Sequence, residues 1–205
     1  MNYETLANTE AVNKAIDALA KLGIEAVLVG NRTEALEQVK SLIPNGASIM
    51  NGSSRTLEEI GFVDYLKSGN HGWKNLHEEI IAEKDPARQA MLRKQAALSD
   101  YYLGSVHAVA ETGQLVIASN SGSQLPHIVF TSPNLIFVVG IQKIAPDLDA
   151  ALLRVREYVL PLEDKRMKDV GMGGSAISKL LIFEREPVFL GRKVHVIFVN
   201  EKIGF

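Results

Sequence analysis

Cysteine is absent from the 205 residues of this chain. This absence excludes disulfides, a thiolate nucleophile and cysteine-held iron–sulfur clusters or zinc within the sequence. None of the side chains present is redox-active in the usual sense, so electron transfer would need a partner chain or a bound organic cofactor. The sequence does not identify such a cofactor.

An excess of positive charge is also missing. The formal net charge is −2 and the isoelectric point is near 6.2, so the chain has no general field that attracts phosphate backbones. The densest basic stretch, Arg88 to Lys94, has glutamine and alanine between its charges, which is typical of a solvated helix face. We therefore expect no nucleic-acid partner.

The sequence has no long apolar run. Its first residues, Met1-Asn2-Tyr3-Glu4, contain neither a basic region nor an apolar stretch, so we expect no signal peptide. No segment approaches the length of a membrane span. We expect a cytoplasmic protein with no membrane partner.

Several catalytic motifs are missing as well. No Gly-Lys-Ser or Gly-Lys-Thr is present, which excludes ATP hydrolysis of the P-loop type, and no Gly-x-Ser-x-Gly elbow supports a serine triad. The histidines do not fall into a metal-binding pattern, so we predict no metal site. They are His71, His77, His107, His127 and His195.

What is present is the composition of an ordinary globular protein. Hydrophobic residues make up 46% and charged residues 22%, which predicts one folded domain over residues 1–205. Apolar residues spaced by three or four predict helices, and short apolar runs predict buried strands. The first part alternates as helix, strand, helix, strand and helix, over 5–22, 26–29, 33–43, 47–50 and from 56 onward.

This alternation predicts an α/β fold, a mostly parallel sheet with helices on both faces, because parallel strands need long crossover connections. Residues 61–102 are helical but interrupted by a loop at 69–72, and Pro86 suits the first turn of a helix. We expect this segment to form a helical cap or lid. Further strands are predicted over 106–110, 115–118, 136–139, 179–183 and 194–199, with a helix over 146–159.

The strongest local signal lies where the second strand ends and a helix begins. Backbone N–H groups at such a point favour an anion, and an arginine there offers a charged fork for a carboxylate or phosphate. In the alternative interpretation Ser54 or Thr56 only caps the helix, with Thr56 and Glu59 as a capping box. The candidate ligand-binding residues are Asn51, Gly52, Ser53, Ser54, Arg55 and Thr56.

A single acid, Glu111, interrupts near-continuous apolar sequence between two predicted strands. A carboxylate so placed could act as a general base, or as a nucleophile that forms an acyl or phosphoryl intermediate. It could equally be a structural acid that accepts hydrogen bonds from the N–H groups of Thr112 and Gly113. Glu111 is thus a candidate catalytic residue, and Thr112 and Gly113 are candidate ligand contacts.

Small polar residues gather in the loop over 119–123. They can wrap a ligand, and a histidine downstream could donate a hydrogen bond or transfer a proton. The alternative is a plain surface loop, followed by a strand that the histidine begins. The loop over 171–175 allows the same two interpretations, an anion nest or a linker. The candidate residues are Ser121, Gly122 and Ser123 for binding and His127 for catalysis.

Five stretches share an order and spacing with a known family. They are Ser54–Gly61, Gly104–Val116 with its Ala-Glu-Thr-Gly element, Leu125–Ile128, Val138–Gly140 and Ile144–Leu148. Together they resemble the LUD domain of lactate-utilisation proteins, over about residues 26–200. The chain looks like the short, single-domain member of that family.

The resemblance implies a fold similar to the ribose-phosphate isomerase and CoA-transferase superfamily. It also implies a role in oxidising lactate beside iron–sulfur protein subunits, with a small carboxylate or a cofactor as the bound anionic ligand. A homo-oligomer is compatible with it.

Two alternative functions remain open. In the CoA-transferase branch of the superfamily a glutamate near a glycine turn attacks the acyl group, and Glu111 matches that role by analogy. The chain could therefore be an independent acyl or phosphoryl transferase or hydrolase. It could also be a regulatory or scaffolding domain.

Overall fold

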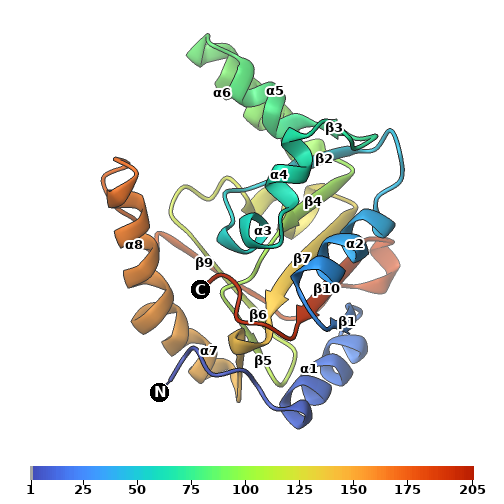
Figure 1. Cartoon of the computed structure of the whole chain (residues 1–205), viewed down its shortest axis with the longest axis vertical. Coiled ribbons are helices and arrows are strands. Elements are labelled where there is room, and N and C mark those ends of the chain that lie inside the picture. Colours follow the sequence, from blue (N-terminus) through green and yellow to red (C-terminus); the bar gives the residue numbers. More distant parts are fainter. Residues whose placement is uncertain (1) are drawn as a thin grey trace.

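The first part of the chain alternates between helices and strands as predicted. The computed structural model describes residues 2–205, and Figure 1 shows the alternation along the blue and cyan ribbon. Asparagines begin the first two helices, because Asn8 accepts a hydrogen bond from the Ala11 N–H and Asn31 accepts one from the Glu34 N–H. The elements are α1 (Thr9–Lys21), β1 (Glu25–Val29), α2 (Arg32–Leu42), β2 (Ser48–Asn51) and α3 (Arg55–Glu59).

Six parallel strands form the main sheet, in the order β1-β10-β7-β4-β2-β3. The central strands are continuous runs of buried apolar residues, as expected for strands that are covered on both faces. The predicted α/β fold with a mostly parallel sheet is confirmed. The later strands of this sheet are β3 (Lys74–Asn75), β4 (Tyr101–Gly104), β7 (Asn134–Gly140) and β10 (Lys193–Val199).

The strand predicted over 26–29 is not buried. It corresponds to β1, which lies at an edge of the sheet and leaves Val27 and Leu28 exposed. A short apolar run fits an edge strand as well as a central one, so the run alone could not decide between them.

A second sheet of four strands, which was not predicted, lies against the first. Its order is β8-β5-β6-β9, and β5 and β6, which correspond to the strands predicted over 106–110 and 115–118, form a tight antiparallel hairpin. The predicted strands over 179–183 and 194–199 therefore belong to different sheets. The strands of the second sheet are β5 (Ala108–Ala110), β6 (Leu115–Ser119), β8 (Ile144–Ala145) and β9 (Lys179–Phe183).

The two sheets share one hydrophobic core. Leu115 and Ile117 of β6 are buried in the same cluster as Phe137 of β7 and the apolar face of α1. On the opposite face of the main sheet, α2, α3 and α4 (Phe62–Lys67) bury Ile136 and Ile197. Helix α7 (Leu148–Arg154) covers the outer face of the second sheet. Helices thus lie on both faces of the main sheet, and one of these faces is covered by the second sheet as well as by a helix.

The helix predicted to end at Val159 is longer. Helix α7 continues through a π-helical turn, Val155–Val159, into α8 (Leu160–Asp169). Pro161 has no N–H to donate, and the π-helical turn just before it shifts the hydrogen-bond pattern, so the helix does not end there. A second π-helical turn, His127–Thr131, stands where the alternative interpretation of the 119–123 loop placed the start of a strand.

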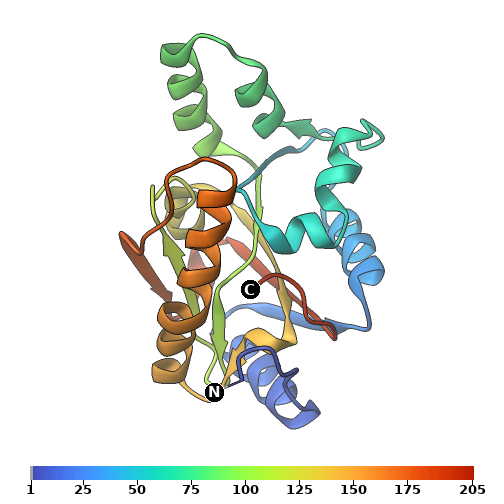
Figure 2. The ribbon, with the colours of Figure 1, turned by 60° about the vertical axis from the view of Figure 1, so that its left-hand side comes forward.

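The projecting part of the predicted cap is shorter than residues 61–102. Helix α4 packs on the main sheet and β3 pairs with β2, whereas α5 (Leu76–Ala82) and α6 (Pro86–Gln95) project from the body (Figure 2). Pro86 begins α6, as predicted. Within residues 2–205, no helix has both the length and the apolar composition that crossing a membrane requires. Short 3₁₀ helices lie at Ala96–Leu98, Ile141–Lys143 and Val188–Leu190.

Replacing Phe137 by alanine should destabilise the protein by about 3–5 kcal/mol, because the ring is fully buried in the shared core and its removal leaves a cavity. The matched control is Phe189→Ala. That ring is 88% exposed, so the change should stay within about 0.5 kcal/mol. Urea unfolding followed by circular dichroism measures both variants, and equal losses of unfolding free energy would contradict the shared core.

Candidate functional site

A cavity of about 370 Å³ opens beside the carboxyl ends of β2, β4 and β6. Ligands of α/β proteins bind at such an edge, and the volume suits a small molecule. Its walls come from segments that lie far apart in the sequence. They fall within residues 52–56, 102–107, 118–124, 155–167 and 172–177, with Lys143 and Phe205 in addition.

Lys143 lines the cavity with only 2% of its surface exposed. Its Nζ donates hydrogen bonds to the hydroxyl oxygens of Thr56 at 2.9 Å and Ser105 at 3.1 Å. Ser105 donates its own proton to the Val106 carbonyl oxygen, which leaves its oxygen free to accept. Among residues 2–205, Lys143 forms no ion pair with a carboxylate. Neutral hydroxyls therefore hold this buried amine.

Burial of this kind favours the uncharged form of Lys143. Desolvation first, and then the charge of nearby Arg154, lower its pKa from the ordinary value of 10.5 to about 7, while Glu59 acts in the opposite direction. Lys143 therefore gains and loses its proton near neutral pH. A strongly shifted pKa inside a cavity is a physical sign of a functional group.

His107 lines the same cavity as a neutral ring. Its Nδ1 accepts a hydrogen bond from the Ala118 N–H at 3.1 Å, which leaves the ring proton on Nε2. Burial first, together with the charges of Lys143 and Arg154, lowers the pKa of His107 to about 3. Arg154 donates to the His107 carbonyl oxygen at 2.7 Å and so holds the backbone in place.

The sequence interpretation missed both Lys143 and His107. Lys143 is the one charged residue in the apolar run over 135–145. That isolation was the signal that could have found it, because lysine is rarely buried without a reason. His107 gave no comparable signal, since a histidine next to a short strand is usually structural.

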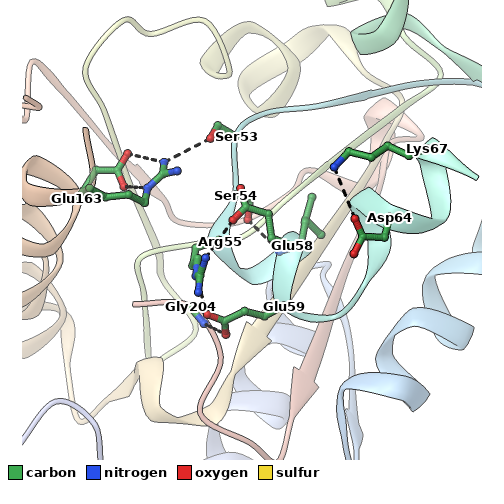
Figure 3. A network of polar contacts seen from close by, with 11 residues as sticks. Ser53, Ser54, Arg55, Glu58, Glu59, Asp64, Lys67, Glu163 and Gly204 are labelled. Atoms are coloured by element: carbon green, nitrogen blue, oxygen red, sulfur yellow. Dashed lines mark hydrogen bonds and ion pairs between the residues drawn. The ribbon is translucent and has the colours of Figure 1, made fainter. Parts of the chain in front are cut away.

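The arginines that line the cavity already have acidic partners (Figure 3). The Nε of Arg55 lies 2.9 Å from an oxygen of Glu59, and Arg166 donates to both oxygens of Glu163 at 2.8 and 2.9 Å. Arg166 also donates to the Ser53 hydroxyl at 3.3 Å. The fork of Arg55, expected to receive a ligand carboxylate or phosphate, is thus engaged by its own helix.

The predicted loop after β2 lies at the cavity, and Ser54 caps the helix as the alternative interpretation expected, but the capping box is absent. Ser54 caps α3, whereas Thr56 accepts the hydrogen bond from Lys143 and Glu59 accepts one from the Gly204 N–H at 2.9 Å. Thr56 and Glu59 therefore do not form a capping box. Of the predicted residues, Gly52, Ser53, Ser54, Arg55 and Thr56 line the cavity, whereas Asn51 is buried outside its lining.

Both loops rich in serine and glycine also reach the cavity. Ser121 and Ser123 line it and lie within hydrogen-bond distance of each other, at 3.0 Å between their hydroxyl oxygens. Gly122 is not a lining residue, but its φ of +84° gives the loop its turn, and its N–H donates to Ser119. The loop over 171–175 contributes Met172, Gly174 and Ser175.

Glu111, Thr112 and Gly113 lie away from this cavity, at the closed end of the β5–β6 hairpin. Glu111 and Thr112 line a separate depression beside α1, and an oxygen of Glu111 lies 3.8 Å from the Nζ of Lys14. The N–H of Gly113 donates to the Ala110 carbonyl oxygen rather than to Glu111. A catalytic role for Glu111 stays a prediction, and the structure does not place Glu111 at the cavity that Lys143 lines.

His127 is buried behind the cavity wall. Its ring stacks on Tyr102, with 4.7 Å between the ring centroids, and its Nδ1 lies 3.0 Å from the Ser132 hydroxyl. Tyr102 lines the cavity, whereas His127 does not. Burial lowers the pKa of His127 to about 4, so the ring is neutral at ordinary pH. In this arrangement His127 supports Tyr102.

The projecting helices do not cover the cavity. Among the described residues, none from 61 to 101 lines it, and α8 with the loop that follows forms the outer wall instead. Over the same described part of the chain, no group of three His, Cys, Asp or Glu side chains is placed to hold a metal ion.

Comparison with known families decides the family of this chain. The model of the LUD domain matches residues 12–199. The chain belongs to the LUD-domain family. The resemblance carried by the Ala-Glu-Thr-Gly and Leu-Pro-His-Ile elements is thereby confirmed. A search of curated proteins found no match to this LUD domain.

One solved structure has a similar fold. A DUF162 family protein from Deinococcus radiodurans is similar with a TM-score of 0.59 and 13% identity, covering 96% of this LUD domain and 100% of that chain. At this identity the likeness concerns the fold. The delta subunit of eIF2B from Chaetomium thermophilum is less similar, with a TM-score of 0.36 and 11% identity over 70% of this chain and 56% of that one.

The pKa of Lys143 predicts how the stability of this LUD domain depends on pH. Between about pH 7 and 10.5 the unfolded chain keeps the lysine proton while the folded chain has released it. The unfolded state then binds more protons, so stability rises with pH, by up to about 1.4 kcal/mol per pH unit. Lys143→Met should lose this part of the rise.

Urea unfolding of the wild type and Lys143→Met between pH 7 and 9.5 measures the difference. Other groups titrate in both proteins and cancel in the comparison. The control is Lys168→Met, which removes an exposed lysine paired with Asp164 and should retain the wild-type slope. The same slope in Lys143→Met and the wild type would contradict the uncharged state of the buried amine.

Proposed function

We propose that this LUD-domain protein binds a small carboxylate in the cavity beside Lys143, and that it acts in lactate utilisation with iron–sulfur partner proteins. The observation that carries the proposal is Lys143 itself. It is a buried amine that lines a cavity and, within residues 2–205, has hydroxyl partners but no acidic one. A bound anion would supply the missing charge.

The chemistry of the cavity supports a small anion. Its lining adds the hydroxyls of Ser53, Ser121 and Ser123, which can donate to carboxylate oxygens. Arg55 and Arg166 are paired with glutamates. When Lys143 is protonated, it is therefore the lining cation that has no acidic partner among residues 2–205. Because a nearby negative charge favours the ammonium form, binding should raise the pKa of Lys143 and take up protons near pH 7.

The redox part of the proposal rests on family and composition. The family is named for lactate utilisation, and the sequence contains no cysteine to hold an iron–sulfur cluster. Lactate oxidation releases two electrons, which this chain has no side chain to carry. We propose that partner proteins accept those electrons.

Lactate or pyruvate should raise the melting temperature of the wild type in a thermal-shift assay. A ligand at about a hundred times its dissociation constant stabilises the fold by about 2.7 kcal/mol, which corresponds to a rise of several degrees. Lys143→Met should lose the shift, because it removes the charge and keeps most of the volume.

Glu111→Gln is the matched control in this assay. Glu111 lies at the separate depression, so its variant should keep the full shift with carboxylates. A shift that survives in Lys143→Met but disappears in Glu111→Gln would move the binding site to the depression. If no carboxylate shifts the wild type, the binding proposal is wrong and a regulatory or scaffolding role gains support.

The purified chain should not oxidise lactate when an artificial electron acceptor is the only added component. The reason is that no residue or cluster in the sequence can take the electrons from the substrate. The measurement is reduction of the acceptor dye with lactate present and absent. Robust turnover without partner proteins would contradict the proposed division of labour.

A further inference from the structure

The hydrogen bonds of Lys143 engage both protons that its nitrogen carries as a neutral amine. As a neutral amine, Nζ has two protons and one lone pair. The two protons match the two acceptors present, the hydroxyl oxygens of Thr56 and Ser105 at 2.9 and 3.1 Å. Ser105 directs its own proton to the Val106 carbonyl, so it does not occupy the lone pair. This arrangement suits a nucleophile at the cavity wall.

We propose that Lys143 forms an imine with the carbonyl carbon of a 2-oxo acid bound in the cavity. This inference rests on the proposed function, because the carboxylate must first bind beside Lys143. In a 2-oxo acid the carbonyl carbon is bonded directly to the carboxylate carbon. When the cavity hydroxyls hold the carboxylate, the ketone carbon next to it can therefore face Nζ.

The reaction needs no oxidant or reductant. The ammonium first releases a proton to solvent, and the lone pair of Nζ then attacks the carbonyl carbon. A C–N bond forms as the C=O π bond breaks, and one proton passes from the nitrogen to the carbonyl oxygen, which gives a neutral carbinolamine. The C–O bond then breaks, the hydroxyl leaves as water with the second proton of the nitrogen, and the nitrogen lone pair forms the C=N bond. The net change is amine plus ketone to imine plus water.

The surroundings of Lys143 favour this chemistry over a structural ion pair. A protein carboxylate fixed at Nζ would hold the proton on the nitrogen whether or not a ligand is bound, and no residue from 2 to 205 supplies one. The backbone at Gly204 also approaches closely: a Cβ there would collide with the Thr56 hydroxyl and lie 2.9 Å from Nζ. Burial of this kind is how proteins prepare lysines for imine formation.

Reductive trapping tests the proposal. The whole chain is incubated with pyruvate and cyanoborohydride near pH 7, and its mass is measured before and after digestion. We expect a single adduct, heavier by one carboxyethyl group and located on Lys143, at least about tenfold more abundant than on any other lysine. Lactate, which has no ketone, should give no adduct. An adduct spread evenly over the exposed lysines would overturn the proposal.

Two variants sharpen the test. Lys143→Arg should abolish the adduct while keeping a positive charge in the cavity, and Lys168→Arg, a change at an exposed lysine, should leave it unchanged. Peptide mapping of the wild type does not depend on the folding of either variant.

The thermal-shift assay separates this inference from the proposed function. If pyruvate stabilises the wild type but no adduct forms on Lys143, carboxylate binding stands and the imine is wrong. If neither pyruvate nor lactate stabilises the protein and pyruvate does not label it, both are wrong.

Discussion

The site depends on one physical constraint, the removal of a lysine amine from water without a carboxylate to balance its charge. Such burial is costly for a charged group, and the cost falls when the group gives up its proton. Lys143 can be placed there because both sheets fix its backbone. It ends the 3₁₀ helix that leads from β7 of the main sheet to β8 of the second. Hydroxyls at Thr56 and Ser105 then satisfy the amine.

The second sheet explains how distant segments come together around this amine. Residues after β2 and β4 reach the cavity from the main sheet, and the loop after β6 reaches it from the second. Because the sheets share a core through Phe137 and Ile117, the loops at the ends of their strands are held in fixed positions relative to one another. The second sheet, with α7 and α8 on its outer side, thus builds half of the site.

Much of this architecture could be predicted from local patterns, and the rest could not. Apolar spacing located the first helices and strands, and turn chemistry placed the polar loops at strand ends. The sheet to which each strand belongs could not be predicted. Both β9 and β10 are short apolar runs, and only their long-range pairing shows that they belong to different sheets. The isolation of Lys143 in an apolar run was a signal of its burial, but its contact with Thr56, 87 positions away, exists only in the folded chain.

Glu111 shows that apolar flanks alone do not place an acid beside a particular cavity. The strands on either side of it are buried, but Glu111 lies at the turn of the hairpin. The cavity lies at the other end of the hairpin, where the two strands are not connected. His107 marks the open end of the β5–β6 hairpin, at the cavity. Four residues of extended chain separate the two, which at about 3.3 Å per residue amounts to roughly 13 Å. An acid that looks central in the sequence therefore contacts Lys14 on α1 instead.

A lysine that changes its protonation near neutral pH can treat two related ligands differently. Lactate and its 2-oxo acid have the same carbon skeleton and the same carboxylate, and they differ at the carbon next to it. The ammonium form of Lys143 can attract either carboxylate, whereas the amine form can react only with the ketone. Under the imine proposal, one buried nitrogen would distinguish the oxidised from the reduced compound. That distinction requires no redox group in the chain, which agrees with a sequence that contains no cysteine.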